Sequence, residues 1–173
     1  RGYKSRVLDW SPFVVLAAGE RPPPPRGIHS PDGVGDRLRA TAFAELQARE
    51  AFSWANERWP DAPEKLREAW RRLAVEEDKH LGWLLTRMDE LGVSVTERPV
   101  SLHLWDSFTA CQTAKQFTER MAGAEERGLR AGERFHRKLA ERDPVTAQMF
   151  GQIAREEAGH VALAKRFLPL LAD

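Results

Sequence analysis

The chain has 173 residues, of which 42% are hydrophobic and 31% are charged, a composition typical of a globular domain large enough to bury a core. Its 27 basic and 26 acidic residues leave a net charge of +1, which argues against general electrostatic binding to nucleic acid or to an anionic membrane. The single cysteine, Cys111, excludes an internal disulfide and a Cys-x-x-Cys pair, and no apolar run reaches the roughly 20 residues of a membrane span. We therefore expect a cytoplasmic protein without a membrane partner, and the initial Arg leaves open whether the native N-terminus is present.

Residues 1–34 are rich in proline and include the run of four prolines at residues 22–25. Such a run favours extended polyproline II structure and excludes a long helix. The sequence therefore predicts an extended N-terminal arm over residues 1–34, in which Trp10 and Phe13 could dock on the rest of the protein. Residues 30–33, Ser-Pro-Asp-Gly, are predicted to form a turn.

Four long helices are predicted after the arm, over residues 35–58, 63–91, 104–141 and 144–167. Proline-containing breaks at residues 59–63 and 142–144 separate the first from the second and the third from the fourth. Gly92 suits the end of the second helix, and Asp143 suits the N-cap of the fourth. Gly128 and Gly132 mark places where the third helix could kink. The predicted fold is an all-α four-helix bundle over residues 35–173, with a long crossover between helices 2 and 3.

Two Glu-x-x-His motifs are the strongest functional signal in the chain. They are formed by Glu77 and His80, and by Glu157 and His160. A further glutamate stands 32 residues before each motif, Glu45 before Glu77 and Glu125 before Glu157, so that the second set repeats the first 80 positions later. This is the ligand set of a two-metal carboxylate site in a helical bundle.

The spacing places each of these glutamates opposite its motif in an antiparallel helical hairpin. The midpoint between Glu45 and Glu77 is position 61, and that between Glu125 and Glu157 is position 141, so both midpoints lie in or beside a predicted break. Both pairs then lie about 24 Å along the helices from their turns. Residues at i and i+3 share a helix face, so each Glu-x-x-His pair can bind one ion.

Neighbouring residues support this choice of glutamates. Glu77 and Glu157 fall on apolar helix faces. Glu125 also has apolar neighbours on its helix face, whereas Glu126 is flanked by charged residues, so Glu125 is the predicted ligand. Glu45 is preferred to Glu50 because it keeps the two hairpins symmetric. A lone Glu-x-x-His is ordinarily a solvated surface pair, whereas two mirrored sets favour a metal site. The predicted metal ligands are Glu45, Glu77, His80, Glu125, Glu157 and His160.

At these residues the chain resembles the ferritin-like di-iron proteins, and more narrowly the DUF455 family. The resemblance covers about residues 30–168 and is carried by the stretches around Glu45, Glu76-Glu77-Asp78-Lys79-His80, Glu125 and Glu156-Glu157-Ala158-Gly159-His160. It implies a ferritin-like four-helix bundle holding two Fe ions, two Mn ions or a mixed Mn/Fe pair on the six residues above. It implies no particular reaction, since the chemistry of the family is largely unassigned.

Three functional hypotheses follow from such a centre. The first is an oxygen- or peroxide-dependent oxidoreductase of the hydroxylase or oxidase type, whose partners are dioxygen or peroxide, an unidentified substrate and an unidentified electron donor. The second is a non-cage iron-binding or ferroxidase protein, and the third is a non-catalytic metal-binding bundle. Such bundles commonly pair as antiparallel homodimers, but the sequence identifies no interface.

Overall fold

The computed structural model describes residues 8–172, and every regular element in that part of the chain is helical. The helices are α1 (Pro31–Arg58), α2 (Glu64–Glu90), α3 (His103–Thr109), α4 (Ala114–Leu139) and α5 (Pro144–Phe167), followed by the short 3₁₀ helix η1 (Leu168–Leu170). The all-α prediction is therefore confirmed. Residues 1–7 of the predicted arm lie outside the described residues. None of the helices within residues 8–172 is both long and apolar enough to cross a membrane.

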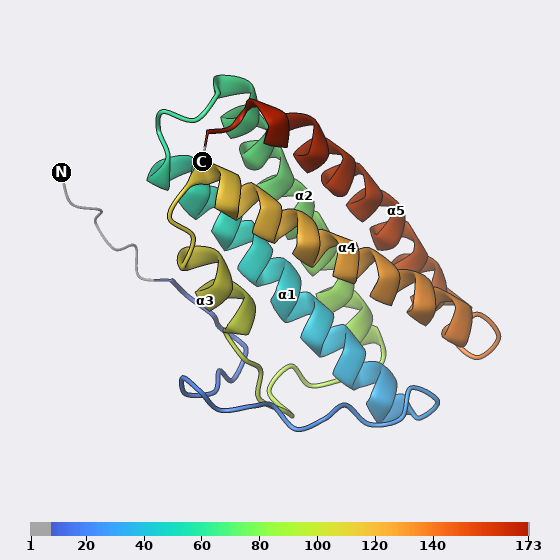
Figure 1. Ribbon diagram of the computed structural model, residues 1–173. Coiled ribbons are helices and arrows are strands. Elements are labelled where there is room, and N and C mark those ends of the chain that lie inside the picture. The colour runs from blue at the N-terminus through green and yellow to red at the C-terminus, as the bar shows by residue number, and fades with distance from the viewer. Residues whose placement is uncertain (1–7, 173) are drawn as a thin grey trace.

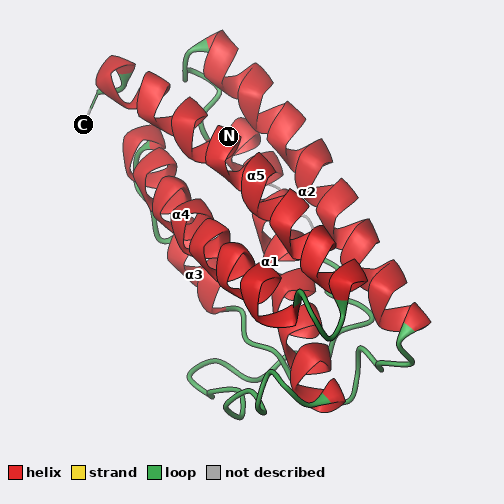
Figure 2. Ribbon diagram, turned by 90° about the vertical axis from the view of Figure 1, so that its right-hand side faces the viewer, coloured by secondary structure: helices red, strands yellow, loops and turns green. Residues whose placement is uncertain are grey.

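The four long helices lie side by side and form two hairpins (Figures 1 and 2). α1 packs mainly against α2, and α4 packs mainly against α5. The hairpins are joined by a long connection over residues 91–113, which contains α3, and α3 packs against both α1 and α4. This connection brings α4 back beside α1 with the opposite chain direction (Figure 1).

The helix boundaries follow local capping chemistry. The side chain of Ser30 accepts a hydrogen bond from the Gly33 amide, and Pro31 occupies the first helical position. The predicted turn at residues 30–33 is therefore wrong, because these residues begin α1 four residues earlier than expected. Asp143 caps α5 as predicted, and Gly92 ends α2 with a φ of +66° that favours glycine.

The prediction of one helix over residues 104–141 is wrong. α3 ends at Thr109, and α4 begins at Ala114 with the Thr113 side chain accepting from the Gln116 amide. α4 then runs unbroken through Gly128 and Gly132. A Cβ atom on Gly132 would lie 3.1 Å from the Ala154 Cβ, so this glycine permits a close approach of α4 to α5 rather than a kink.

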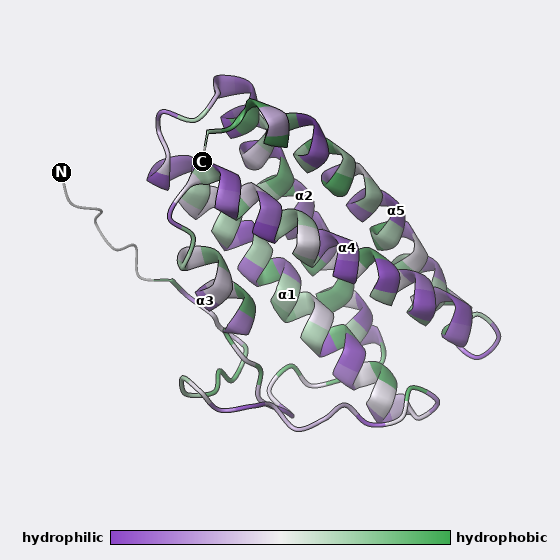
Figure 3. Cartoon of the chain, in the orientation of Figure 1, coloured by the Kyte–Doolittle hydropathy of each residue, from purple (hydrophilic) through white to green (hydrophobic). Residues whose placement is uncertain are grey.

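The core consists of two apolar clusters. One cluster includes Leu38, Phe43, Leu84, Met88 and Phe150, and the other includes Phe52, Trp70, Leu73, Phe117 and Met121. Hydrophilic residues cover much of the outer faces of the helices (Figure 3).

The described part of the arm is docked on this core. Trp10 and Phe13 pack against Phe43, with ring centroids 5.8 and 4.9 Å away. The backbone of Val100 in the crossover exchanges hydrogen bonds with Val14 and Leu16. The arm therefore contributes to the same hydrophobic core as the helices.

Candidate metal centre

The six predicted ligands meet inside the protein, although they come from four different helices. Glu45 lies on α1, Glu77 and His80 on α2, Glu125 on α4, and Glu157 and His160 on α5. Each is at most 7% exposed. They form two groups of four, and within each group the potential ligand atoms all lie within 4.8 Å of one another. The first group is Glu45, Glu77, His80 and Glu157, and the second is Glu77, Glu125, Glu157 and His160.

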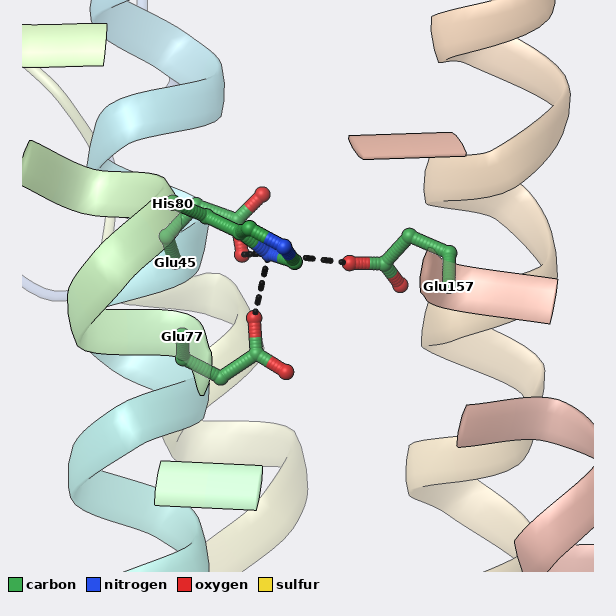
Figure 4. A group of neighbouring side chains, drawn as sticks. All are labelled: Glu45, Glu77, His80 and Glu157. Carbon is green, nitrogen blue, oxygen red and sulfur yellow. Dashed lines mark ion pairs between the residues drawn. The ribbon is translucent and has the colours of Figure 1, made fainter. Parts of the chain in front are cut away.

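Both imidazoles present Nδ1 to the carboxylates. His80 Nδ1 lies 3.4 Å from Glu77, 3.7 Å from Glu157 and 3.8 Å from Glu45 (Figure 4). His160 Nδ1 lies 3.0 Å from Glu77 and 3.5 Å from Glu125. Glu77 and Glu157 belong to both groups, so the two groups interlock at these residues.

The other ring nitrogen of each histidine binds a carboxylate from the opposite hairpin. His80 Nε2 lies 2.7 Å from Glu156, and His160 Nε2 lies 2.8 Å from Glu76. A carboxylate can only accept from this nitrogen near neutral pH, so it keeps a proton on Nε2 and makes Nδ1 the ring nitrogen that can bind a metal once it has lost its own proton. Lys79 Nζ, 2.6 Å from Glu156, further positions that carboxylate.

Sequence reasoning missed these two positioning carboxylates. The available signal was the doubled glutamate, since Glu76 precedes Glu77 and Glu156 precedes Glu157 in both motifs. Each first glutamate stands four positions before the histidine of its own motif, a spacing that suggests a contact within the helix. Only the packing of α2 beside α5 shows that each carboxylate instead reaches the other histidine.

Several buried polar atoms of the six residues have no hydrogen-bond partner among the described residues. They are both carboxylate oxygens of Glu77, Glu125 Oε1, Glu157 Oε2 and the Nδ1 atoms of His80 and His160. Buried polar side chains are normally hydrogen-bonded, because leaving one unpaired costs about 1–3 kcal/mol. A concentration of such oxygen and imidazole atoms is the donor set that divalent metal ions prefer, so these residues fit a metal site.

The electrostatics of the metal-free site favour bound protons. Burial, with the neighbouring carboxylates, raises the pKa of Glu45, Glu77 and Glu157. Burial would also raise the pKa of Glu125, but its hydrogen bonds with Glu157 and His160 outweigh this effect and lower the pKa instead. Burial alone would lower the pKa of His160, but the carboxylates of Glu125 and Glu77 outweigh it and raise the pKa to about 11. Divalent cations would therefore displace protons when they bind.

The two rejected glutamates lie outside the cluster. Glu126 is partly exposed and pairs with Arg130 at 2.9 Å. Glu50 is buried, but its carboxylate binds the Arg49 guanidinium at 2.8 Å and joins neither group of four. The structure therefore brings Glu45 and Glu125 into the cluster and leaves Glu50 and Glu126 outside it.

The carboxylate side of the centre opens on a cavity of about 470 Å³ between α1 and α4. Glu45, Glu125 and Glu157 line its inner end, whereas most of the remaining lining is apolar. The Nε2 atoms of both histidines bind Glu76 and Glu156, neither of which lines this cavity. The carboxylate side of the site is therefore accessible to a small molecule in the cavity, whereas the side of the histidine Nε2 atoms is closed by hydrogen bonds to Glu76 and Glu156.

Fold and site together define an all-helical protein with a buried glutamate–histidine cluster able to hold metal ions. The chain belongs to the DUF455 family, described as a protein of unknown function, whose family model matches residues 12–173. Neither the curated proteins nor the solved structures contain a match to the chain.

Proposed function

We propose that the chain is a ferritin-like four-helix bundle with a dinuclear Fe or Mn centre, and that it acts as an oxygen- or peroxide-dependent oxidoreductase. The observation that carries the proposal is the pair of interlocking groups of four, which share Glu77 and Glu157. Two groups of four potential ligands that share two carboxylates suit a pair of neighbouring ions better than a single ion.

The donor set divides naturally between two ions. Glu45 and His80 would hold one ion, Glu125 and His160 would hold the other, and Glu77 and Glu157 are available to both. Four carboxylates balance the formal charge of two divalent cations, which removes most of the cost of burying them. Carboxylate oxygens with imidazole nitrogens suit Fe and Mn.

When bound, two redox-active ions supply the electrons that reduce dioxygen or peroxide. The protein itself contributes geometry and a dry environment. Glu76 and Glu156 hold protons on the outer nitrogens of the histidines, so that both rings keep Nδ1 directed inward. The buried apolar side chains of both core clusters exclude bulk water. The cavity admits a substrate from the carboxylate side.

Elemental mass spectrometry of protein purified without chelator tests the metal centre. We expect about two Fe or Mn ions per chain, and their loss in a Glu77→Ala/Glu157→Ala double variant. The matched control is Glu126→Ala/Glu133→Ala, which removes two carboxylates outside the cluster and should keep the metal.

Wild-type protein that holds no metal even after anaerobic reconstitution with Fe(II) or Mn(II) would overturn the proposal. For metal-loaded protein, consumption of dioxygen or peroxide with a chemical reductant is the next measurement. Oxidation of added Fe(II) alone, without turnover of any organic compound, would favour a ferroxidase. Metal binding without any consumption would favour a non-catalytic bundle.

A further inference from the structure

The cavity between α1 and α4 has the size and lining of a small-molecule site. Its volume of about 470 Å³ falls within the usual range for ligand pockets. It exists because small residues face it at successive turns of both helices: Ala40, Ala44 and Ala48 on α1, and Ala124, Gly128 and Ala131 on α4. Hydrophobic colouring is visible along the middle of α1 (Figure 3).

Larger apolar side chains complete the walls. They include Ile28, Phe108, Met121, Phe135, Phe150 and Ile153. Most polar lining residues belong either to the carboxylates of the metal centre or to the charged group of Asp36, Arg37, Arg134 and Lys138, and Thr41 and Arg127 are the others. The rest of the lining is apolar, so a ligand that fills the middle must itself be largely apolar.

The inner end of the cavity consists of buried carboxylates of the metal centre. Glu125 is 5% and Glu157 is 3% exposed, and each has one oxygen without a hydrogen-bond partner among the described residues. Both residues line the cavity together with Glu45. A molecule in the cavity therefore reaches the atoms that would hold the metal ions.

The outer end carries positive charge from Arg37, Arg134 and Lys138. Arg134 and Lys138 are one turn apart on α4, and neither has an ion pair within residues 8–172. The Arg37 guanidinium donates to the backbone carbonyls of Arg26 and Gly33. Burial lowers the pKa of Arg37, the nearby Asp36 opposes this change, and the positive charge of Arg134, which lines the same cavity, adds to it.

The acidic residue at this end does not neutralise those cations. The Asp36 carboxylate binds Arg26 at 2.7 Å, Arg98 at 2.5 Å and Arg39 at 3.2 Å. It is therefore already shared among three other guanidinium groups.

The helix register gives the separation of the two ends. Arg37 precedes Glu45 by eight residues on α1, and Arg134 follows Glu125 by nine residues on α4. At the rise of an α-helix these separations are about 12 and 13.5 Å. Because α1 and α4 run in opposite directions, both arginines lie at the same end of the cavity (Figure 1).

We propose that this cavity binds an apolar monocarboxylic acid, with its carboxylate at Arg37, Arg134 and Lys138 and its far end beside Glu45, Glu125 and Glu157. The assignment of this acid as the oxidised substrate rests on the proposed function, whereas its binding does not. The basic rim selects the anion, and the apolar walls select the hydrocarbon body.

Isothermal titration calorimetry with decanoate tests the assignment, since its extended chain is about as long as the cavity. Decan-1-ol serves as the uncharged comparison. We expect the Arg134→Gln/Lys138→Gln variant to bind decanoate about tenfold more weakly, while its affinity for decan-1-ol stays within about twofold of wild type. The matched control is Arg130→Gln/Arg137→Gln, which removes the same charge from α4 at positions that do not line the cavity and should bind both ligands normally.

A second variant tests the body of the cavity. Ala48→Phe places a ring among the walls and should weaken both ligands, with circular dichroism confirming the helical fold. Failure of wild-type protein to bind decanoate would overturn the assignment, as would equal weakening in the control variant. Metal content measured on the same samples separates the two proposals. Metal without decanoate binding overturns the cavity assignment alone, and decanoate binding without metal supports it while overturning the dinuclear centre.

Discussion

Replacing Glu77 with leucine should stabilise the metal-free protein and abolish its stabilisation by metal. Glu77 is fully buried, and neither of its oxygens has a hydrogen-bond partner among the described residues. Each unpaired buried polar atom costs about 1–3 kcal/mol, and leucine removes both oxygens of Glu77. Part of this gain is lost because His160 Nδ1, 3.0 Å away, loses a neighbouring carboxylate. We therefore expect the free energy of unfolding to rise by about 2 kcal/mol in chelator.

The expected change in melting temperature differs between protein in chelator and protein with bound metal. For a chain of this size about 1 kcal/mol corresponds to 2–4 °C, so Glu77→Leu should melt about 4–8 °C above wild type in chelator. Metal at 100 times its dissociation constant stabilises wild type by about 2.7 kcal/mol per ion, or about 5–11 °C. The variant should show no such rise.

Differential scanning calorimetry at pH 7, with chelator and with anaerobic Fe(II) or Mn(II), measures both effects. Glu68→Leu on the exposed face of the same helix is the matched control and should behave as wild type in both solutions. The reasoning is refuted if Glu77→Leu melts below wild type in chelator. It is equally refuted if metal still raises the melting temperature of the variant by the wild-type amount.

Two further predictions concern residues outside the six. Glu76→Gln and Glu156→Gln each replace the acceptor that holds a histidine, so competition with a metal-binding dye should show affinity reduced by about 10–100-fold; unchanged affinity in both would contradict the positioning role. Asp36→Ala removes the carboxylate shared by Arg26, Arg39 and Arg98 and leaves the buried Arg39 with Glu97 as its one carboxylate partner among the described residues, so it should destabilise the protein by about 3 kcal/mol at pH 7 in urea denaturation. The arginines around Asp36, Arg26 foremost, hold its pKa well below the usual value, so its stabilisation is fully present above the unfolded pKa of about 3.9 and is lost as the pH falls below that value. A difference between wild type and Asp36→Ala that stayed constant from pH 7 to pH 3 would contradict this account.

The sequence by itself determined the elements whose signals are local. The predicted helix over residues 144–167 coincides with α5, and that over residues 63–91 differs from α2 by one residue at each end. Capping residues and prolines mark these ends directly. The break before Ala114 was missed because its cap, Thr113, is a weak signal inside a long helical pattern.

The sequence also identified the six residues that converge. The spacing of 32 residues from Glu45 to Glu77 recurs from Glu125 to Glu157, so both pairs lie at the same distance along the helices from the turns of their hairpins. Their convergence is observed, and their role as metal ligands stays a prediction. What only the tertiary structure decided is how one hairpin faces the other. The contacts of Glu76 and Glu156 with the opposite histidines, and the cavity between α1 and α4, both depend on that placement. The two hairpins are joined by the crossover at residues 91–113, and the 80-residue repeat of the motifs does not determine how one hairpin is oriented against the other. Packing of side chains across the core sets that orientation.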